Sequence, residues 1–445
     1  MILSQKQKEA LLKYKKGENI FITGPGGSGK SELIKIINND ANLKRKKIQI
    51  CALTGCAAIL LKCKALTLHS WAGIGLGKAP LENIVYKIGK NPKIRERWCD
   101  IRILVIDEVS MMSKKLFNLL NRLAQIIRKS DKLFGGIQLI FSGDFYQLPP
   151  VGDKNDAESK QYCFESDYWY DVFNINNHIE LTTIFRQTDE TFTNILDCVR
   201  RGNINSKSIN VLIDRLHKVP ESNILITKLY PTKAKVERIN KIELDKLSDK
   251  PVIYTLQRIR NTINLTAKQR LILTSLSEKE IETELLQLES NLHCNNILEL
   301  KIGCQVMCLI NIFDPTTETI KLANGSQGKV IGFENIEGNE LPIILFDNNL
   351  RHTMNYYLWE CEKVPGAGIK QIPLIHSWAL TIHKCQGLTL NNVELDIGNN
   401  IFEYGQTYVA LSRVKNLNGL YLRNFDYTKI KSHQKVIAFY EQINV

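Results

Sequence analysis

The feature that most restricts the fold of this chain is the octet at residues 24–31, Gly-Pro-Gly-Gly-Ser-Gly-Lys-Ser. An apolar run at residues 19–23 precedes it and predicts a buried strand, and residues 32–37 follow with the apolar spacing of a helix. The pattern G-x-x-x-x-G-K-[ST] is a phosphate-binding loop when it lies between a strand and a helix in this way. The sequence therefore predicts an α/β domain that binds a nucleoside triphosphate. The alternative is a glycine-rich turn with a chance lysine.

The residue types of the octet suit a chain of phosphates. Glycines let the backbone turn its N–H groups inward, and the helix that follows adds free N–H groups and the positive end of its dipole. Lys30 would contact the outer phosphates, and the Ser31 hydroxyl would bind Mg²⁺. We therefore expect ATP to be surrounded by Gly24, Pro25, Gly26, Gly27, Ser28, Gly29, Lys30 and Ser31.

Composition restricts the class of protein. The length of 445 residues suggests roughly three domains. No run approaches the roughly 20 apolar residues of a membrane helix, so we expect no membrane partner. The N-terminal residues lack the pattern of a secretory or transit signal. We expect an intracellular, reducing location, which is the nucleus, the cytoplasm or, for a viral chain, a viral factory.

Charge and cysteine content further restrict the class of protein. The chain has 59 lysines and arginines against 46 aspartates and glutamates, a formal net charge of +13. This excess favours a polyanionic partner such as nucleic acid, and the alternative is a basic surface that serves solubility. Eleven cysteines without a C-x-x-C pair argue against a zinc site and for buried thiols in a reducing compartment.

Apolar runs at residues 48–53, 101–106 and 137–142 predict further strands of a parallel sheet. Ligands bind at the carboxyl ends of such strands, and Asp107 and Glu108 follow the second of these runs. Asp107 would hold Mg²⁺, and Glu108 would orient and deprotonate the attacking water. The alternative for this pair is a solvated acidic turn at the end of a strand.

The run at residues 137–142 leads into Gly-Asp-Phe-Tyr-Gln-Leu-Pro-Pro at residues 143–150. The two prolines fix the backbone and forbid helix, so Gln147 is held in place. Its neutral amide could sense the γ-phosphate. The alternative is a structural turn.

These strings, in this order, resemble the PIF-one family of superfamily 1 DNA helicases. The most discriminating stretches are residues 67–75, Thr-Leu-His-Ser-Trp-Ala-Gly-Ile-Gly, and residues 143–151. The chain departs from the family at Cys56, where an aliphatic residue is usual, and at Cys385, where serine is usual. Further segments that match in order are residues 3–7, 53–58, 107–112, 181–187, 229–233, 300–307, 323–328, 379–390 and 408–414.

Residues 300–372 differ from their surroundings. Short strand-like runs at residues 306–310, 329–333 and 343–346 are separated by turns, which predicts a small β-barrel. Residues 262–292 before it have the apolar spacing of an amphipathic helix.

The resemblance implies two recombinase-like P-loop α/β domains, with an SH3-like β-barrel inserted in the second. The predicted first domain is residues 1–185, which carry the phosphate loop. The predicted second domain is residues 186–299 and 373–445, and the insertion is residues 300–372. The nucleotide would lie in the cleft between the two α/β domains.

The resemblance also assigns residues outside the phosphate loop. Gln7 would read the adenine, and Gln386 would contact ATP. Arg186 would be an arginine finger, and Arg413 would reach the phosphates from the second domain. A DNA track across both domains would include Thr54, His69, Thr381, His383 and Lys384. For His69 the alternative is interior packing beside Trp71, whose ring is either a core aromatic or a base-stacking surface.

The implied activity is that of an ATP-dependent DNA helicase. It would move 5′ to 3′ on single-stranded DNA and unwind forked duplexes, with G-quadruplexes and RNA–DNA hybrids as further candidate substrates. The polarity comes from the resemblance alone. We expect a monomer in solution that uses ATP and Mg²⁺. The alternatives are a translocase that does not unwind and a nucleotide-switched DNA-binding module.

Overall fold

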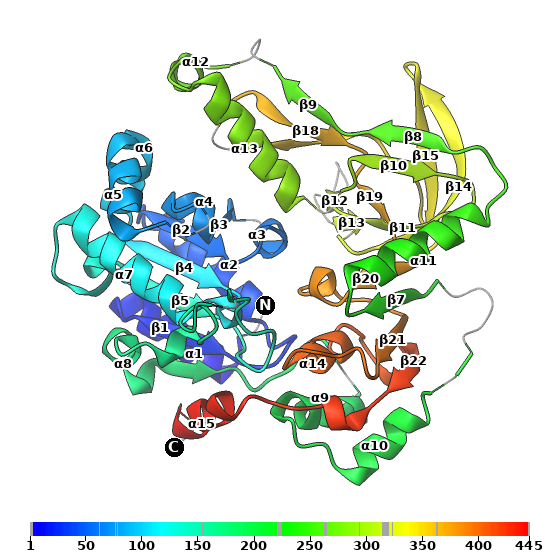
Figure 1. Ribbon diagram of the computed structural model, residues 1–445, viewed down its shortest axis with the longest axis horizontal. Helices are drawn as coiled ribbons and strands as arrows, with labels where there is room; N and C mark the ends of the chain where they lie inside the picture. Colours follow the sequence, from blue (N-terminus) through cyan, green and yellow to red (C-terminus); the bar gives the residue numbers. More distant parts are fainter. Residues whose placement is uncertain are drawn as a thin grey trace. The chain divides into compact units, whose positions relative to one another are not determined.

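The structure is a computed structural model in which contacts divide the chain into two compact units (Figure 1). The first unit contains Met1–Leu216, Ile397–Leu417 and Asn424–Val445, and the second contains His217–Asp396 and Asn418–Arg423. The structure describes residues 3–443 except residues 62, 76, 78, 154, 188, 217, 220–224, 262–264, 293, 314–319, 323, 362 and 363. It does not describe the side chains of residues 56, 59, 60, 268, 291, 313, 320, 321 and 384.

A six-stranded parallel sheet forms the centre of the first unit, in the order β3-β2-β4-β5-β1-β6. The four predicted strands are confirmed within one to two residues at each end. β3 and β6 were not predicted, because they are only two and three residues long. The strands are β1 (Ile20–Thr23), β2 (Ile48–Ala52), β3 (Leu66–Thr67), β4 (Ile103–Asp107), β5 (Gln138–Ser142) and β6 (His178–Glu180).

Each face of this sheet contributes to a separate apolar core. Along β1, Ile20 and Ile22 belong to one core and Phe21 to the other, as the alternation of side chains in a strand requires. The helices of the unit are α1 (Gln5–Lys16), α2 (Lys30–Leu43), α3 (Gly55–Leu61), α4 (Leu68–Ala72), α5 (Leu81–Lys90), α6 (Pro92–Asp100), α7 (Lys114–Arg128), α8 (Trp169–Val172), α9 (Glu190–Arg201), α10 (Ser206–Ile213), α14 (Gln406–Leu411) and α15 (Gln434–Ile443).

The last helix of the chain packs against the core of the first unit. The ring of Phe439 on α15 lies 4.4 Å from that of Phe164 and 6.0 Å from that of Phe21 on β1. Apolar burial of this kind fixes a terminal helix in place. The compact units therefore differ from the predicted domains, because residues 186–216 and most of residues 397–445 pack with the phosphate loop.

A second parallel sheet lies mainly in the second unit, with strand order β20-β7-β21-β22. Its strands are β7 (Thr227–Tyr230), β20 (Ala379–Thr381), β21 (Val393–Ile397) and β22 (Leu420–Phe425), and α11 (Lys233–Asp245) packs against β7 and β20. The chain is thus a mixed α/β protein with two parallel sheets, which confirms the predicted α/β class.

The rest of the second unit is mostly antiparallel. A five-stranded sheet has the order β16-β15-β14-β11-β19, and the predicted runs at residues 306–310, 329–333 and 343–346 overlap β11, β14 and β15. The antiparallel strands extend beyond the predicted 300–372, from Val252 to His376. They are β8 (Val252–Thr255), β9 (Gln257–Arg260), β10 (Ile297–Leu300), β11 (Gln305–Cys308), β12 (Ile312–Phe313), β13 (Ile320–Leu322), β14 (Gln327–Ile336), β15 (Asn339–Phe346), β16 (Arg351–Thr353), β17 (Tyr357–Glu360), β18 (Ala367–Gln371) and β19 (Leu374–His376).

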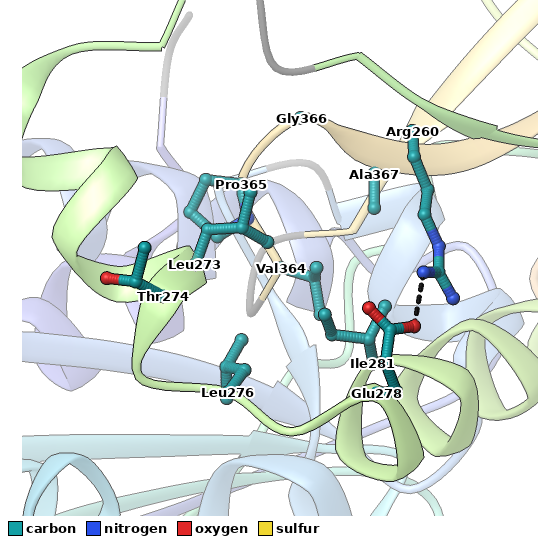
Figure 2. Close-up of a pocket in the computed structure, with 10 residues that line it drawn as sticks. All are labelled: Arg260, Leu273, Thr274, Leu276, Glu278, Ile281, Val364, Pro365, Gly366 and Ala367. Carbon is teal, nitrogen blue, oxygen red and sulfur yellow. Dashed lines mark hydrogen bonds and ion pairs between the residues drawn. The ribbon is translucent and has the colours of Figure 1, made fainter.

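Two helices, α12 (Ala267–Thr274) and α13 (Glu278–Asn291), replace the single predicted amphipathic helix. The break falls where Ser277 caps α13 by accepting a hydrogen bond from the Glu280 N–H. A pocket of about 350 Å³ lies between these helices and the strands β9 and β18 (Figure 2). Its walls are mainly apolar, and one ion pair, Arg260–Glu278 at 2.5 Å, lies at its edge.

Candidate nucleotide-binding site

The backbone between β1 and α2 has the shape that the octet predicts. Gly24 has φ +137° and Gly27 has φ +85°, conformations that side chains other than glycine rarely adopt. A side chain at either position would also clash with its neighbours. A Cβ on Gly24 would lie 2.4 Å from the Leu181 carbonyl oxygen, and one on Gly27 would lie 2.4 Å from the Arg186 Cβ. Only glycine allows the loop to pack this closely against the segment that carries Arg186.

Two polar side chains of the loop are suited to an anionic ligand. The buried Ser28 hydroxyl has no hydrogen-bond partner among the described residues. The Lys30 ammonium donates to the carbonyl oxygens of Gly24 (2.6 Å) and Pro25 (3.0 Å). Burial lowers the pKa of Lys30, and the nearby carboxylates, Asp144 first among them, act in the opposite direction. A phosphate oxygen would accept hydrogen bonds from both side chains, and its negative charge would compensate the buried ammonium of Lys30.

The predicted acidic pair lies at the end of β4. Asp107 is 5% exposed, and burial raises its pKa, while the Ser142 side chain, the Glu108 backbone and Lys30 lower it. Glu108 has φ +58° and ψ +39°, a left-handed conformation that a non-glycine residue rarely holds. Such strain concentrates at functional sites. The solvated acidic turn is therefore excluded for Asp107.

The loop after β5 holds Gln147 in a buried position, 5% exposed. The Gln147 N–H donates to the Asp144 carbonyl at 2.8 Å, which closes the turn. A Cβ on Gly405, at the start of α14, would lie 2.4 Å from the Tyr146 carbonyl oxygen. The loop that carries Gln147 is thus packed directly on the segment that leads to Arg413.

Both predicted arginines lie beside the phosphate loop within the first unit. Arg186 Nη1 donates to the Ser412 carbonyl at 3.1 Å, and Arg413 Nε donates to the Val409 carbonyl at 2.8 Å. A Cβ on Gly26 would lie 3.7 Å from Arg413 Nη2. Burial lowers the pKa of Arg186 to about 10, and the positive charge of Arg413 contributes to this. Two guanidinium groups held close together in a buried site favour an anion between or beside them.

The motif around Arg413 predicts that this side chain reaches the phosphates from the second domain or from its boundary. The contacts place it in the same compact unit as Lys30, because the whole of α14 is buried there.

Gln7 lies next to the loop at the start of α1. Its Oε1 accepts a hydrogen bond from the Ser4 N–H at 2.9 Å, and its N–H donates to the Ser4 hydroxyl at 3.3 Å. This capping box fixes the amide. A Cβ on Gly29 would lie 2.7 Å from Gln7 Nε2, so the amide nitrogen faces the phosphate loop.

Of the predicted DNA contacts, Thr54 and His69 lie in the first unit. The Thr54 hydroxyl accepts a hydrogen bond from the Ala57 N–H (3.2 Å) and caps α3. His69 is half-buried on α4, and burial lowers its pKa. The Trp71 ring is 1% exposed and lies 4.7 Å from the Trp98 ring, so it is a core aromatic and no stacking surface.

The other predicted DNA contacts lie in the second unit, near the end of β20. Thr381 is buried at 8% exposed, while His383 is exposed. Gln386, which is predicted to contact ATP, is half-buried in the same segment. The side chain of Lys384 lies outside the described residues. Cys385 is fully buried, so its thiol offers no surface to DNA.

Sequence reasoning missed a buried ion pair behind the site. Arg200 on α9 and Asp144 are 2% and 0% exposed, and Arg200 Nη2 lies 3.0 Å from Asp144 Oδ1. Arg200 Nη1 also lies 3.0 Å from Glu180 Oε1, and its guanidinium covers the Tyr146 ring at 4.7 Å. Arg200 and Asp144 are 56 residues apart in the sequence, and the sequence around either one alone predicts an ordinary surface charge. The pair fixes the loop that carries Gln147.

The C-terminal helix reaches the same network. The Tyr440 hydroxyl lies 2.5 Å from the Thr23 hydroxyl, directly before the phosphate loop, and accepts a hydrogen bond from the Phe145 N–H at 3.2 Å. The Tyr440 ring stacks on Tyr146 at 4.6 Å. Nothing in the local sequence around Tyr440 indicates this contact.

Known proteins share this architecture. The family profile described as PIF1-like helicase matches residues 2–210. The crystal structure of Pif1 helicase from Candida albicans is 34% identical, with 100% of both chains covered and a TM-score of 0.77. The chain belongs to the PIF1-like helicase family. This confirms the resemblance that the motifs indicate.

Other PIF1-like helicases are similar over nearly the whole chain. Human ATP-dependent DNA helicase PIF1 is 34% identical over 98% of this chain and 63% of the human protein. The chain thus spans less than two thirds of the length of the curated PIF1 relatives first matched. Pif1 helicase from Bacteroides, crystallised with ADP-AlF3 and single-stranded DNA, is 26% identical, with 100% and 98% of the chains covered and a TM-score of 0.66.

Proposed function

We propose that this chain is an ATP-dependent DNA helicase that moves 5′ to 3′ on single-stranded DNA and unwinds forked duplexes. The observation that carries the proposal is the site around one glycine loop, where Lys30, Asp107, Glu108, Arg186 and Arg413 are all present in the first unit. The Bacteroides relative, which holds a nucleotide analogue together with single-stranded DNA, supports the same activity here.

The proposed chemistry assigns one task to each group. Lys30 would exchange its two carbonyl partners for phosphate oxygens, and the guanidinium groups of Arg186 and Arg413 would stabilise the charge of the transferring phosphoryl group. Glu108 would orient the attacking water and accept its proton. The oxygens of Ser31 and Asp107 are ligands that Mg²⁺ prefers, and the ion would neutralise phosphate charge there.

Motion would come from two α/β parts that grip DNA differently as the nucleotide changes. The two parallel sheets, one in each unit, support two recombinase-like domains, predicted as residues 1–185 and as residues 186–299 with 373–445. The antiparallel sheet of β11, β14, β15, β16 and β19 supports an SH3-like insertion at residues 300–372. ATP can drive movement only through contacts that differ between the two states.

Unwinding of tailed duplexes tests the proposal. We expect ATP-dependent strand release from a duplex with a 5′ single-stranded tail and none from one with a 3′ tail. Glu108→Gln is the control, because it keeps the shape of the side chain and removes the base. Strand-stimulated ATP turnover without release from any fork would favour the translocase instead. Release from the 3′-tailed duplex alone would reverse the polarity.

A nucleotide-switched DNA-binding module without turnover is the second candidate. The charged groups of the proposed ATP site argue against it. A switch that does not hydrolyse ATP needs neither a general base such as Glu108 nor the pair Arg186 and Arg413 at the phosphates. Measurable ATP hydrolysis that rises with single-stranded DNA would exclude this candidate.

DNA binding should weaken steeply with salt. The net charge of +13 favours phosphate contacts, which release counterions on binding. For about four neutralised phosphates, the logarithm of the binding constant should fall with a slope of about −3, roughly a 50-fold loss between 50 and 200 mM salt. Fluorescence anisotropy of a labelled single strand measures this. A slope near zero would contradict a binding mode based on phosphates.

A further inference from the structure

One donor of the phosphate loop is already held by a side chain of α14. The Gly26 N–H donates to the Tyr408 hydroxyl at 2.8 Å. Gly26 belongs to the run of N–H groups with which such loops surround phosphates. The loop cannot offer this N–H to a phosphate oxygen while Tyr408 accepts it.

Tyr408 has no room to turn away by itself. Its side chain is 2% exposed, and every residue of α14 is buried. Burial raises the pKa of Tyr408, so the hydroxyl stays neutral and its oxygen remains an acceptor for the Gly26 N–H. Because protein interiors are closely packed, the hydroxyl can withdraw only if α14 shifts with it.

Arg413 would move with α14. Its Nε donates to the Val409 carbonyl in that helix, and its Nη2 donates to the Ser412 hydroxyl at 2.7 Å. After Arg413 the chain continues for a few residues into β22, a strand of the second parallel sheet. A shift of α14 therefore has a covalent path to the second unit.

We propose that Tyr408 is a positioning residue that holds the Gly26 N–H and gives it up to a phosphate, so that nucleotide entry displaces α14 together with Arg413. The inference rests on the proposed nucleotide site. It adds the residue through which the phosphate loop would report its occupancy to the segment that carries an arginine finger.

The affinity of the full chain for ADP tests this inference. The wild type must break the Tyr408–Gly26 hydrogen bond to bind, whereas Tyr408→Phe has no such bond to lose. We expect Tyr408→Phe to bind ADP roughly two- to tenfold more tightly in isothermal titration calorimetry, the range of one net hydrogen bond. Tyr14→Phe is the matched control, because it also removes a hydrogen bond of a buried tyrosine, to Asp40 at 3.0 Å, and should leave the affinity unchanged.

Other outcomes of these measurements would overturn the inference. Unchanged or weaker ADP binding by folded Tyr408→Phe would overturn the inference and leave the proposed function intact. A wild type that does not bind ADP would overturn both. If Tyr408→Phe does not fold, the full chain with 3-fluorotyrosine at position 408 replaces it. Its fluorine resonance should move with ADP at the midpoint of binding, and a resonance that stays fixed would overturn the inference.

Discussion

Replacing Lys30 with alanine should reduce ATP hydrolysis stimulated by single-stranded DNA by at least about 10²–10³-fold, the loss typical of removing one group that stabilises transition-state charge. The Lys30 ammonium lies at the start of α2 and donates to two loop carbonyls, which phosphate oxygens can replace. Alanine keeps the helix and removes the charge. Steady-state phosphate release at saturating single-stranded DNA measures the effect.

Lys35→Ala is the matched control for this change. Lys35 lies on the same helix, is half-buried and pairs with Glu32 at 2.6 Å. Helical surface pairs of this kind contribute at most about 1 kcal/mol, so turnover and folding should be close to those of the wild type. Turnover that survives Lys30→Ala, or falls equally in both variants, would show that the phosphate site has been assigned wrongly.

Glu108→Gln should separate binding from chemistry. The amide has the shape of the carboxylate and cannot take a proton from water, so ATP turnover should fall by about 10²–10⁴-fold. The affinity for ADP should change little, because Glu108 acts on the water. Calorimetry and phosphate release on the same preparation test both halves. A joint loss of affinity and turnover would indicate that Glu108 shapes the loop instead.

The parts of the site that the sequence predicts are those carried by short local patterns. A strand, a turn and a helix are neighbours in sequence, so the octet fixes the phosphate loop and the position of Lys30. Asp107 directly follows a buried strand, and parallel strands bring their carboxyl ends to one edge. This is why Asp107 could be assigned before any coordinates, together with the loop that holds Gln147.

The parts that the sequence could not predict depend on pairs distant along the chain. Tyr440 meets Thr23 across 417 residues, and Tyr408 meets Gly26 across 382 residues. No periodicity or spacing encodes such contacts. The sequence did not distinguish a core position of Trp71 from a base-stacking surface position. Burial of its ring against Trp98 shows that Trp71 is a core residue. The boundary of the first unit escaped prediction for the same reason, since packing of α14 and α15 sets it.

Replacing Arg200 with leucine should lower the free energy of unfolding by about 3–5 kcal/mol. The guanidinium is 2% exposed, and it is the buried cation that faces Asp144 and Glu180. Without it, Asp144 would stay fully buried and would lose its guanidinium partner. Urea unfolding followed by tryptophan fluorescence measures the change, since Trp71, Trp98 and Trp169 are buried in this unit.

Arg201→Leu is the control one residue further along α9. Its guanidinium is 54% exposed and pairs with Asp197 one turn away, so the loss should stay below about 1 kcal/mol. Adding Asp144→Asn to Arg200→Leu should recover part of the lost stability, because the double variant no longer buries the Asp144 carboxylate without its guanidinium partner. Equal losses in Arg200→Leu and Arg201→Leu would contradict a buried pair that holds the Gln147 loop against the phosphate site.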